Sequence, residues 1–469
     1  MSESSLFSIA PLLAVTAMGL LVLIVEALVT ESENLSYWVT VLGLSASGIL
    51  SYLTMQESAP AYNGMITVGG YGNYFTALFI VSALLTTILS RDYLKKTHTN
   101  FGEFYLLIIF STIGMMLIAS ANDLIMVFLG IELMSICLYV LAGFMRRQPS
   151  ANEASLKYFL LGAFATGFLL YGIALIYGAT GTTNIPAIIE KFPSQSLLFW
   201  SGIGLLLIGF AFKAGAVPFH MWIPDVYQGS PTTVSGFMST GAKAAAFSAF
   251  VLVFAHQFQG GEKLRTALSV LAAASMILGN IVAIAQSNIK RMLAYSSVAH
   301  AGYMIIGLAA GNALGKSGIV FYLTSYMFMN IGAFGILSIL EQEGEKNLTF
   351  EDYAGLGRKK PLLAAMMSVF MLSLAGLPPF GGFFGKYYIF VAAVNSNLTW
   401  LAIIGVVMSV VSVYYYLRLV MVMYFQENDS EVTAKPAMAS FVVLAIATLA
   451  VLQLGVFPSS LLSIINTLF

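Results

Sequence analysis

Three ionisable side chains stand deep within apolar stretches of the sequence. Glu132 lies in the middle of one stretch, and Lys213 and Lys243 lie in two later ones. A charge at the centre of a bilayer costs about 2.5–3.5 kcal/mol on insertion scales, so such residues need compensating partners and a reason to be there. Burial favours the neutral amine of a lysine and a nearby carboxylate favours its ammonium, so a buried lysine can exchange a proton, whereas arginine stays charged. The three residues therefore predict proton transfer, with helix bridging as the structural alternative for Glu132.

Three further residues extend this set and also have plainer explanations. Lys386 and Lys157 lie nearer the ends of their stretches, where each could extend its amine to a membrane interface. His300 lies mid-stretch, where an imidazole could pass a proton near neutral pH or could simply be a hydrogen-bonded packing residue. We predict a relay linked by internal water, with a Glu132–Lys213 pair as its switch. Its members, in chain order, are Glu132, Lys157, Lys213, Lys243, His300 and Lys386.

The remaining histidines and one arginine suit peripheral roles. His220 suits an interface or the mouth of a channel, and His98 and His256 suit loops or edges. Arg418 stays charged, so packing or snorkelling is expected of it rather than proton transfer.

Two similar hexapeptides interrupt apolar stretches, namely Ala214-Gly-Ala-Val-Pro-Phe219 and Ala375-Gly-Leu-Pro-Pro-Phe380. Proline removes a backbone donor and glycine permits unwinding, so each helix is expected to break within the membrane. The copies lie in the seventh and twelfth expected spans, five positions apart, so the second should cross in the opposite direction. Paired broken helices in inverted repeats indicate an ion or substrate pathway, whereas isolated proline kinks are the plain alternative.

The composition indicates that lipid, and not water, covers most of the surface of this chain. Of 469 residues, 59% are apolar and only 9% are charged, against about 25% charged in ordinary soluble domains. The mean hydropathy is +0.87, which excludes a disordered chain and nearly excludes a soluble one. The 21 basic residues balance the 21 acidic ones, so no nucleic-acid partner is expected. The single cysteine, Cys137, rules out an intrachain disulfide and leaves too few ligands for an iron–sulfur or zinc site. We expect an integral membrane protein that binds no cofactor of its own.

Apolar stretches long enough to cross a bilayer, about 20 residues each, fill the chain. The expected fold is all-α and integral to the membrane, with about 14 transmembrane helices and two inverted five-helix repeats, each containing a broken helix. The spans lie near residues 6–30, 36–55, 73–90, 101–121, 123–144, 154–178, 197–222, 230–256, 264–286, 289–311, 314–341, 361–392, 398–425 and 436–466. They group as an N-terminal three-helix segment (1–100), a first repeat (101–256), a second, inverted repeat (264–425) and a C-terminal span (436–469).

Basic loop residues are distributed unequally between the two sides of this arrangement. The richer side should be cytoplasmic, which places both termini on the non-cytoplasmic side of a bacterial inner membrane. It holds Arg91, Lys95, Lys96, Arg146, Arg147, Lys290, Arg291, Lys346, Arg358, Lys359, Lys360 and Lys435, and the other side holds Lys191, Lys263, Arg265 and Lys316.

The motifs around these residues resemble a known family. The segment from Lys213 to Asp225, Lys-Ala-Gly-Ala-Val-Pro-Phe-His-Met-Trp-Ile-Pro-Asp, resembles the signature of the antiporter-like subunits of respiratory complex I, Mrp-type antiporters and membrane-bound hydrogenases. Within that superfamily the segments 156–165, 294–303 and 381–386 are similar to subunit N of complex I. The resemblance covers essentially the whole chain.

The resemblance implies roles for matching positions. Glu132 would be the carboxylate partner of Lys213, Lys243 would be the central relay lysine, and Lys386 would be the exit-side lysine. Lys157 would assist near the glutamate. The chain would translocate protons beside other complex I membrane subunits and lipids, while NADH and quinone bind to other subunits.

Two other functions fit the same sequence. An Mrp-type subunit exchanging sodium for protons would use the same carriers, and a structural subunit that moves no ion would leave the charges facing other chains. The electron donor, NADH or ferredoxin, is a property of other subunits and does not follow from this sequence.

Overall fold

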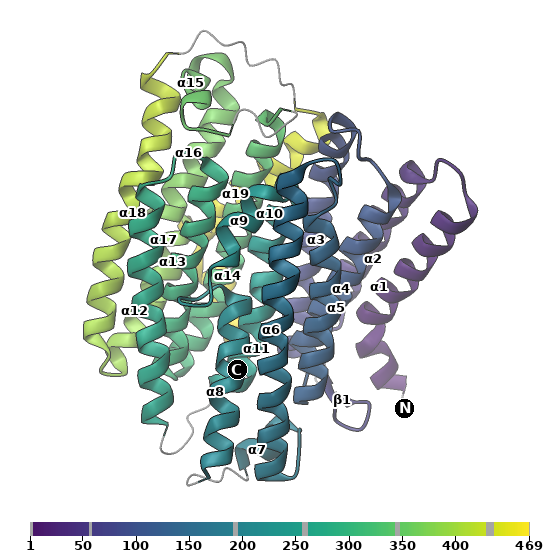
Figure 1. Cartoon of the computed structure of the whole chain (residues 1–469), viewed down its shortest axis with the longest axis vertical. Helices are drawn as coiled ribbons and strands as arrows, with labels where there is room; N and C mark the ends of the chain where they lie inside the picture. Colours follow the sequence, from purple (N-terminus) through teal and green to yellow (C-terminus); the bar gives the residue numbers. More distant parts are fainter. Residues whose placement is uncertain are drawn as a thin grey trace.

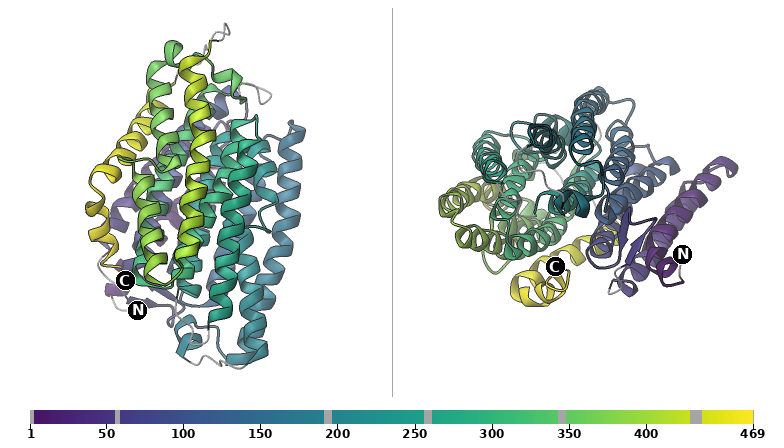
Figure 2. Two further views of the ribbon diagram at one scale, coloured as in Figure 1. Left: turned by 90° about the vertical axis from the view of Figure 1, so that its left-hand side faces the viewer. Right: turned by 90° about the horizontal axis from the view of Figure 1, so that it is seen from below.

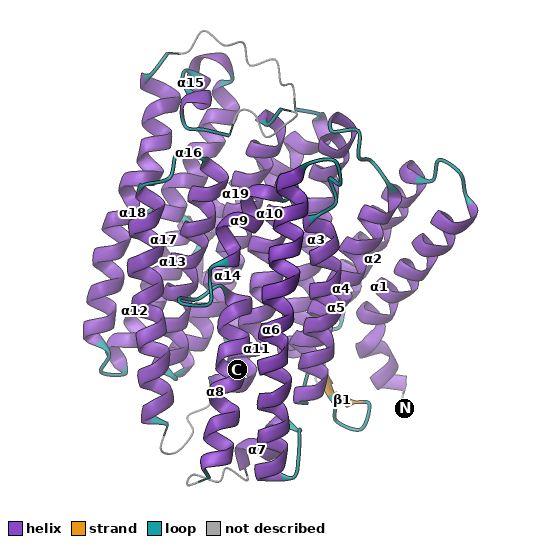
Figure 3. Ribbon diagram, viewed as in Figure 1, coloured by secondary structure: helices purple, strands orange, loops and turns teal. Residues whose placement is uncertain are grey.

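The computed structural model describes residues 3–55, 59–190, 196–255, 261–342, 348–427 and 436–468. Nearly all of this chain is helical, and the long helices stand side by side as one bundle (Figures 1 and 3). We call the end of the bundle that carries α15 (Leu356–Lys359) the upper face, and the end that carries α7 (Ile185–Glu190) the lower face. Both ends of the described chain lie toward the lower face (Figure 2).

The prediction of an all-α membrane protein with about fourteen spans is confirmed. Thirteen helices of the described chain are long and apolar enough to cross a membrane, and the shorter α16 crosses together with α17. The crossing helices are α1 (Glu3–Leu28), α2 (Glu33–Leu53), α3 (Gly70–Lys96), α4 (Gly102–Ser120), α5 (Leu124–Ala142), α6 (Pro149–Thr180), α8 (Leu197–Ala214) with α9 (Trp222–Gly229), α10 (Thr232–Phe237) with η1 (Met238–Ala242) and α11 (Lys243–Phe254), α12 (Glu262–Ile284), α13 (Ile289–Ala310), α14 (Ala313–Leu340), α16 (Pro361–Ala375) with α17 (Gly381–Asn395), α18 (Thr399–Phe425) and α19 (Met438–Val456).

Several local expectations were wrong. The stretch 436–466 is not one helix, because α19 ends at Val456 and a separate helix α20 (Pro458–Ile465) begins at a proline. A two-stranded antiparallel hairpin, β1 (Ala59–Ala61) with β2 (Ile66–Val68), lies at the lower face, where no strand was expected. The cations Arg91, Lys95 and Lys96 lie on the last turns of α3 rather than in a loop.

A short 3-10 helix η2 (Glu351–Tyr353) precedes α15. Lys191, His256, Lys346 and Lys435 lie outside the described residues.

Both hexapeptides break their helices, as predicted. The first break separates α8 from α9 and the second separates α16 from α17. In Figure 1 the chain rises from α8 to α9 and descends from α16 to α17, so the broken helices run in opposite directions. This matches the direction expected of inverted copies. The division into two five-helix repeats, 101–256 and 264–425, stays a prediction.

The two breaks are built in the same way. Each first half-helix ends at a glycine in the left-handed region, Gly215 with φ 76° and Gly376 with φ 85°. At the first break the amides of Gly215 and Ala216 donate to the carbonyls of Phe212 and Ala211 at 3.1 and 2.8 Å. The equivalent pair of bonds closes the second break, from residues 376 and 377 to residues 373 and 372 at 2.9 and 3.1 Å. This is the Schellman motif, which uses a left-handed residue to end a helix and satisfy its last carbonyls.

A third irregularity lies in the crossing that carries Lys243. The π-helix η1 joins α10 to α11, and Lys243 is the first residue after it. Single π-turns are rare within helices and leave backbone groups outside the regular i to i−4 pattern. All three central lysines therefore lie beside an interruption of their helix or of its partner half-helix.

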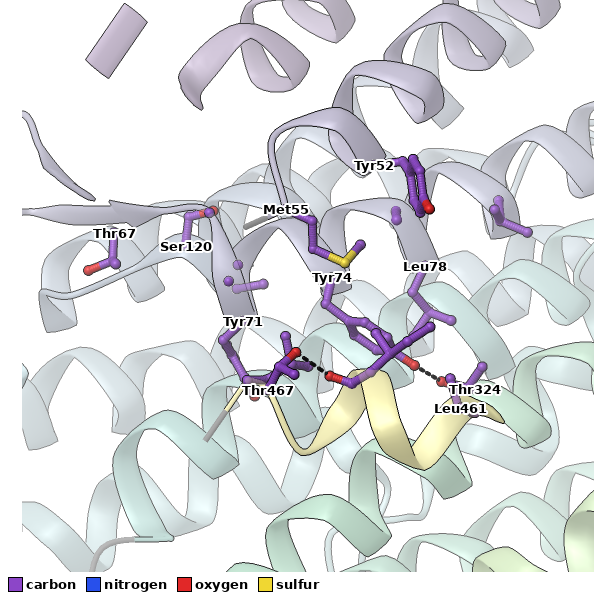
Figure 4. A pocket seen from close by; sticks show the side chains of 18 of the residues that line it. Tyr52, Met55, Thr67, Tyr71, Tyr74, Leu78, Ser120, Thr324, Leu461 and Thr467 are labelled. Atoms are coloured by element: carbon purple, nitrogen blue, oxygen red, sulfur yellow. Dashed lines mark hydrogen bonds between the residues drawn. The ribbon is translucent and has the colours of Figure 1, made fainter. Parts of the chain in front are cut away.

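A cavity of about 1080 Å³ lies away from these interruptions, at the lower face (Figure 4). Side chains of α3, α14 and α20 line it, including Tyr74, whose hydroxyl bonds Thr324 Oγ1 at 2.6 Å. None of the six predicted relay residues lines this cavity.

The break at Gly215 provides a test of this geometry. A Cβ at this position would lie 1.9 Å from Ile223 Cδ1 and would occupy the left-handed region, so Gly215→Ala should cost about 1–2 kcal/mol of stability. Gly204→Ala in the same helix α8 is the control, since a Cβ there meets nothing within 4 Å. Thermal unfolding of the purified protein in detergent should show a lower midpoint for the first variant alone. Equal midpoints would contradict the assigned backbone conformation.

Candidate functional site

Lys213 occupies the last turn of α8, next to the first break, and its side chain is buried. Its Nζ donates to Ser135 Oγ at 2.7 Å and to the Tyr139 hydroxyl at 3.3 Å, both on α5. The rings of Tyr139 and Tyr158 lie 5.4 and 5.9 Å from this nitrogen, within cation–π range. Hydroxyls, π-faces and the negative end of the α8 dipole thus replace the water that this amine loses.

Glu132 lies one helical turn before Ser135 on the same face of α5. It is close enough to Lys213 to interact electrostatically, but the lysine binds Ser135 and Tyr139 instead of its carboxylate. Glu132 Oε1 is buried with no hydrogen-bond partner among the described residues. The Glu132–Lys213 pair stays a prediction, and in this structure the Ser135 hydroxyl is the nearest hydrogen-bond partner of Lys213 among the described residues.

Lys243 lies at the centre of the bundle and is 2% exposed. Its Nζ donates to the main-chain carbonyl of Ser297 on α13 at 2.6 Å and lies 5.9 Å from the ring of Tyr326 on α14. The hydroxyls of Ser297 and Tyr326 are buried without hydrogen-bond partners in the described part of the chain. Buried hydroxyls are usually satisfied by protein or water, so this region is suited to hold water.

His300 follows Ser297 by one turn of α13 and is fully enclosed. Its Nδ1 contacts the Tyr322 hydroxyl at 2.6 Å and its Nε2 contacts the Tyr416 hydroxyl at 3.0 Å. A tyrosine hydroxyl can both donate and accept, so the imidazole can hold its proton on either nitrogen. Both Lys243 and Lys386 interact electrostatically with this ring, which places His300 between the two lysines.

Lys386 lies on α17, directly after the second break, and is 3% exposed. Its Nζ donates to the carbonyls of Leu374 and Ala375 at 3.2 and 2.9 Å, and to Ser409 Oγ at 2.8 Å. The lysine thus binds the carbonyls at the end of α16, where the helix dipole favours a cation. This contact corrects the alternative that Lys386 extends to an interface.

Lys157 belongs to a different cluster, nearer the upper face. Its Nζ pairs with Asp225 Oδ2 at 2.8 Å and with Glu153 Oε1 at 2.6 Å, and its side chain is 42% exposed. Arg291 NH1 binds the other oxygen of Asp225 at 2.8 Å. The structure therefore brings Lys157 to Asp225, and not to Glu132 as the resemblance implied.

Of the residues expected to have peripheral roles, one is buried and two lie as predicted. His220 is buried within the first break and not exposed at an interface, and its Nδ1 has no partner among the described residues. Arg418 has the packing role expected of it, stacking on Phe350 at 4.4 Å. His98 lies in the loop after α3, as expected. In the described ranges, no group of three or more histidine, cysteine, aspartate or glutamate side chains is placed to hold a metal ion.

The hydroxyls around these groups were not among the residues predicted from the sequence. Tyr322 and Tyr326 lie four residues apart on α14, on the face that meets His300, and both are buried. A tyrosine pair at this spacing in an apolar helix was a usable signal, since a buried hydroxyl needs a partner. The roles of Ser135, Ser297 and Tyr416 depend on packing between distant helices and carried no such signal.

Comparisons with known proteins define the class. Residues 121–412 match the family described as NADH:quinone oxidoreductase/Mrp antiporter, TM. NADH-quinone oxidoreductase subunit N of Salinibacter ruber is 47% identical and covers 91% of this chain and 86% of its own length. The subunit N of Trichlorobacter lovleyi is 45% identical, with coverage of 97% and 95%.

Solved structures of related proteins have the same fold as this chain. A chain of respiratory complex I from Thermus thermophilus is 38% identical, with a TM-score of 0.86 over 97% of this chain and 98% of that one. A chain of the Mrp complex from Dietzia sp. has a TM-score of 0.87 at 20% identity, which shows a shared fold alone.

The fold and its buried lysines are those of an antiporter-like membrane subunit. The chain belongs to the NADH-quinone oxidoreductase subunit N family, as the sequence motifs predicted. It is a multi-pass, proton-translocating membrane subunit, and the Thermus thermophilus chain to which it is similar is part of respiratory complex I. The more distant Mrp likeness does not favour the sodium-exchanging alternative.

The His300 contacts provide a test of the site geometry. Tyr322→Phe removes the partner of a buried ring nitrogen, which should cost about 1–3 kcal/mol of stability. Tyr414→Phe on α18 is the control, because that side chain is 60% exposed. The thermal unfolding midpoint should fall for the first variant only. A fall of the same size in both variants would argue against the His300–Tyr322 bond.

Proposed function

We propose that protons pass through this chain along Glu132, Lys213, Lys243, His300 and Lys386. The observation that carries the proposal is that three lysines at bilayer depth each bind neutral oxygens of other helices. Neutral oxygens solvate an ammonium but also tolerate the neutral amine, so each lysine can load and release a proton. A lysine locked in a tight carboxylate pair would release its proton less readily.

A row of aromatic side chains, three of them tyrosines, extends from the first lysine toward the second. Tyr139 packs edge-on against Tyr158 at 4.7 Å, and Tyr158 stacks on Trp222 at 4.4 Å. Trp222 in turn contacts Tyr227, whose hydroxyl lies close to that of Ser297 beside Lys243. Water between these hydroxyls would complete a path from Lys213 to Lys243.

His300 with Tyr322 and Tyr416 would carry protons from the second to the third lysine. The ring lies between Lys243 and Lys386, and both of its nitrogens contact hydroxyls. An imidazole accepts a proton at one nitrogen and releases it from the other, so the relay needs no large movement at this point.

Glu132 would act as the switch, through Ser135. A proton moved against 100 mV costs about 2.3 kcal/mol, so the relay must be gated. If Glu132 rotates toward Lys213 it replaces Ser135 as partner and holds the ammonium, and when it withdraws the proton is free to leave. Lys157 would hold α9 in place through Asp225 instead of carrying protons.

The energy would come from electron transfer in other subunits, as the names of the relatives indicate: they are subunits of an NADH–quinone oxidoreductase. This chain would convert their conformational or electrostatic signal into proton movement. The enzyme assignment is therefore that of a translocase subunit with no redox chemistry of its own.

The upper face would be cytoplasmic. Arg147, Lys290, Arg291, Lys359 and Lys360 all lie at that face, and few cations lie at the lower one, where Lys263 and Arg265 begin α12. Both termini would then lie on the non-cytoplasmic side of a bacterial inner membrane.

Replacement of Lys243 tests the relay. Lys243→Ala should lower the number of protons taken up per NADH oxidised by the assembled complex in vesicles. Lys243→Arg should lower it as well, because arginine keeps the charge but cannot release the proton. Lys263→Ala, an exposed lysine of the lower face, is the control. Normal stoichiometry in both Lys243 variants would favour the structural-subunit alternative.

The sidedness is tested separately. Arg147→Cys and Lys263→Cys place exposed thiols at the upper and lower faces, and the native Cys137 is buried. A membrane-impermeant thiol reagent should label position 263 in intact spheroplasts and position 147 only in inverted vesicles. The reverse pattern would invert the assigned orientation.

A further inference from the structure

Glu341 is a buried carboxylate at the upper face that the relay does not use. It caps the end of α14 and is 5% exposed. Its Oε2 accepts a hydrogen bond from Thr232 Oγ1 at 2.5 Å, at the first turn of α10. No lysine or arginine of the described chain forms a salt bridge with this carboxylate, and Lys96 Nζ instead donates to the main-chain carbonyl of Glu341.

The groups that face Glu341 are known from three elements. Tyr93 on α3 lies within hydrogen-bonding reach and also accepts from the Thr232 amide at 3.3 Å. Lys96, an exposed residue of the same helix, interacts electrostatically with the carboxylate. Tyr353 of η2 is buried beside it, and burial, with the charges of Glu341 and Asp352, raises the pKa of this tyrosine, so its hydroxyl stays protonated. Only one exposed side chain, Lys96, thus separates this carboxylate from solvent among these neighbours.

Unpartnered hydroxyls lead inward from Glu341. Ser90 lies three residues before Tyr93 on α3 and Thr87 three residues before Ser90, and Thr233 follows Thr232 on α10. All three hydroxyls are buried with no hydrogen-bond partner within the described ranges. Since α10 packs against both α3 and α14, the helices that carry these hydroxyls meet at one junction. Buried polar atoms without protein partners indicate internal water.

The α14 helix continues this polar line toward the relay. Ser338, Asn330 and Tyr326 precede Glu341 by 3, 11 and 15 residues, all on one helical face. Phe334 is the apolar member of that face, and it contacts Tyr227 at 6.2 Å. The line ends at Tyr326, beside Lys243. Thr232 and Lys243 are separated by eleven residues of one crossing, roughly 16 Å at helical rise.

We propose that Glu341 takes up protons from the cytoplasmic solution and passes them, through water held by these hydroxyls, to Lys243. The carboxylate binds a proton from solvent, the neutral acid gives it to the water chain, and the chain protonates the neutral amine of Lys243. The carboxylate is then restored, so charge balances over the cycle. Phe334 is the apolar point at which this water chain can be interrupted. This inference rests on the proposed relay and on the upper face being cytoplasmic.

The alternative is that Glu341 only ties α14 to α10. Glu341→Gln separates the two roles, because an amide oxygen still accepts from Thr232 but cannot take up a proton at neutral pH. Glu351→Gln, an exposed carboxylate of the same face, is the matched control. The readout is protons taken up per NADH oxidised by the assembled complex in vesicles, which does not depend on how much complex assembles.

We expect Glu341→Gln to lower that ratio by as much as Lys243→Ala, with Glu351→Gln unchanged. The double variant E341Q/K243A should be no worse than K243A, because the two groups act in series. Glu341→Asp retains a carboxylic acid and should restore part of the ratio, and this variant decides the matter if the Gln variant assembles poorly. A normal ratio for Glu341→Gln beside a lowered one for Lys243→Ala would overturn the intake role alone. A normal ratio for Lys243→Ala would overturn the relay itself.

Discussion

The desolvation of charge is the constraint on which this structure depends. Lysine ammoniums held at bilayer depth must recover, from the protein, the hydrogen bonds that water would otherwise provide. Carboxylates do not supply them directly here. Lys213 uses hydroxyls and aromatic faces, Lys243 uses the main-chain carbonyl of Ser297, and Lys386 uses the carbonyls that end α16. Partners of this kind stabilise a cation without fixing it permanently, and that property separates a carrier from a structural ion pair.

The interrupted helices follow from the same constraint. In a continuous helix the carbonyls accept hydrogen bonds from amides of the same helix. A helix that ends inside the membrane leaves its last carbonyls without these partners, so other groups must satisfy them. The glycines at 215 and 376 end two helices with the same motif, and Lys386 and Trp222 bond to carbonyls near the released ends. The carbonyls released by a helix break therefore accept hydrogen bonds from a buried polar side chain, and that side chain in turn satisfies the carbonyls. Without the other, each group would lose a hydrogen-bond partner in a buried environment.

Local features were predictable from sequence and contacts between distant segments were not. The breaks follow from glycine and proline, whose effects need only the neighbouring residues, and the burial of the three central lysines follows from long apolar stretches. Whether Lys213 binds Glu132 or Ser135 depends on how two helices rotate about their axes, and the bond to Ser135 could not be predicted from sequence. The bond between Lys157 and Asp225 joins α6 to α9, and no local pattern reveals it. In the sequence, Tyr322 and Tyr326 look like any other aromatic residues of an apolar helix.

The carboxylate of Asp225 has a mechanical consequence. One oxygen binds Lys157 on α6 and the other binds Arg291 on α13, so the short segment α9 is clamped on two sides at once. These helices belong to different halves of the expected repeat arrangement. A tilt of α9 must stretch at least one arm of the clamp, and a shift of α13 pulls on α9 in return. Asp225 thereby ties α9, a segment of about two turns, to α6 and α13 at once.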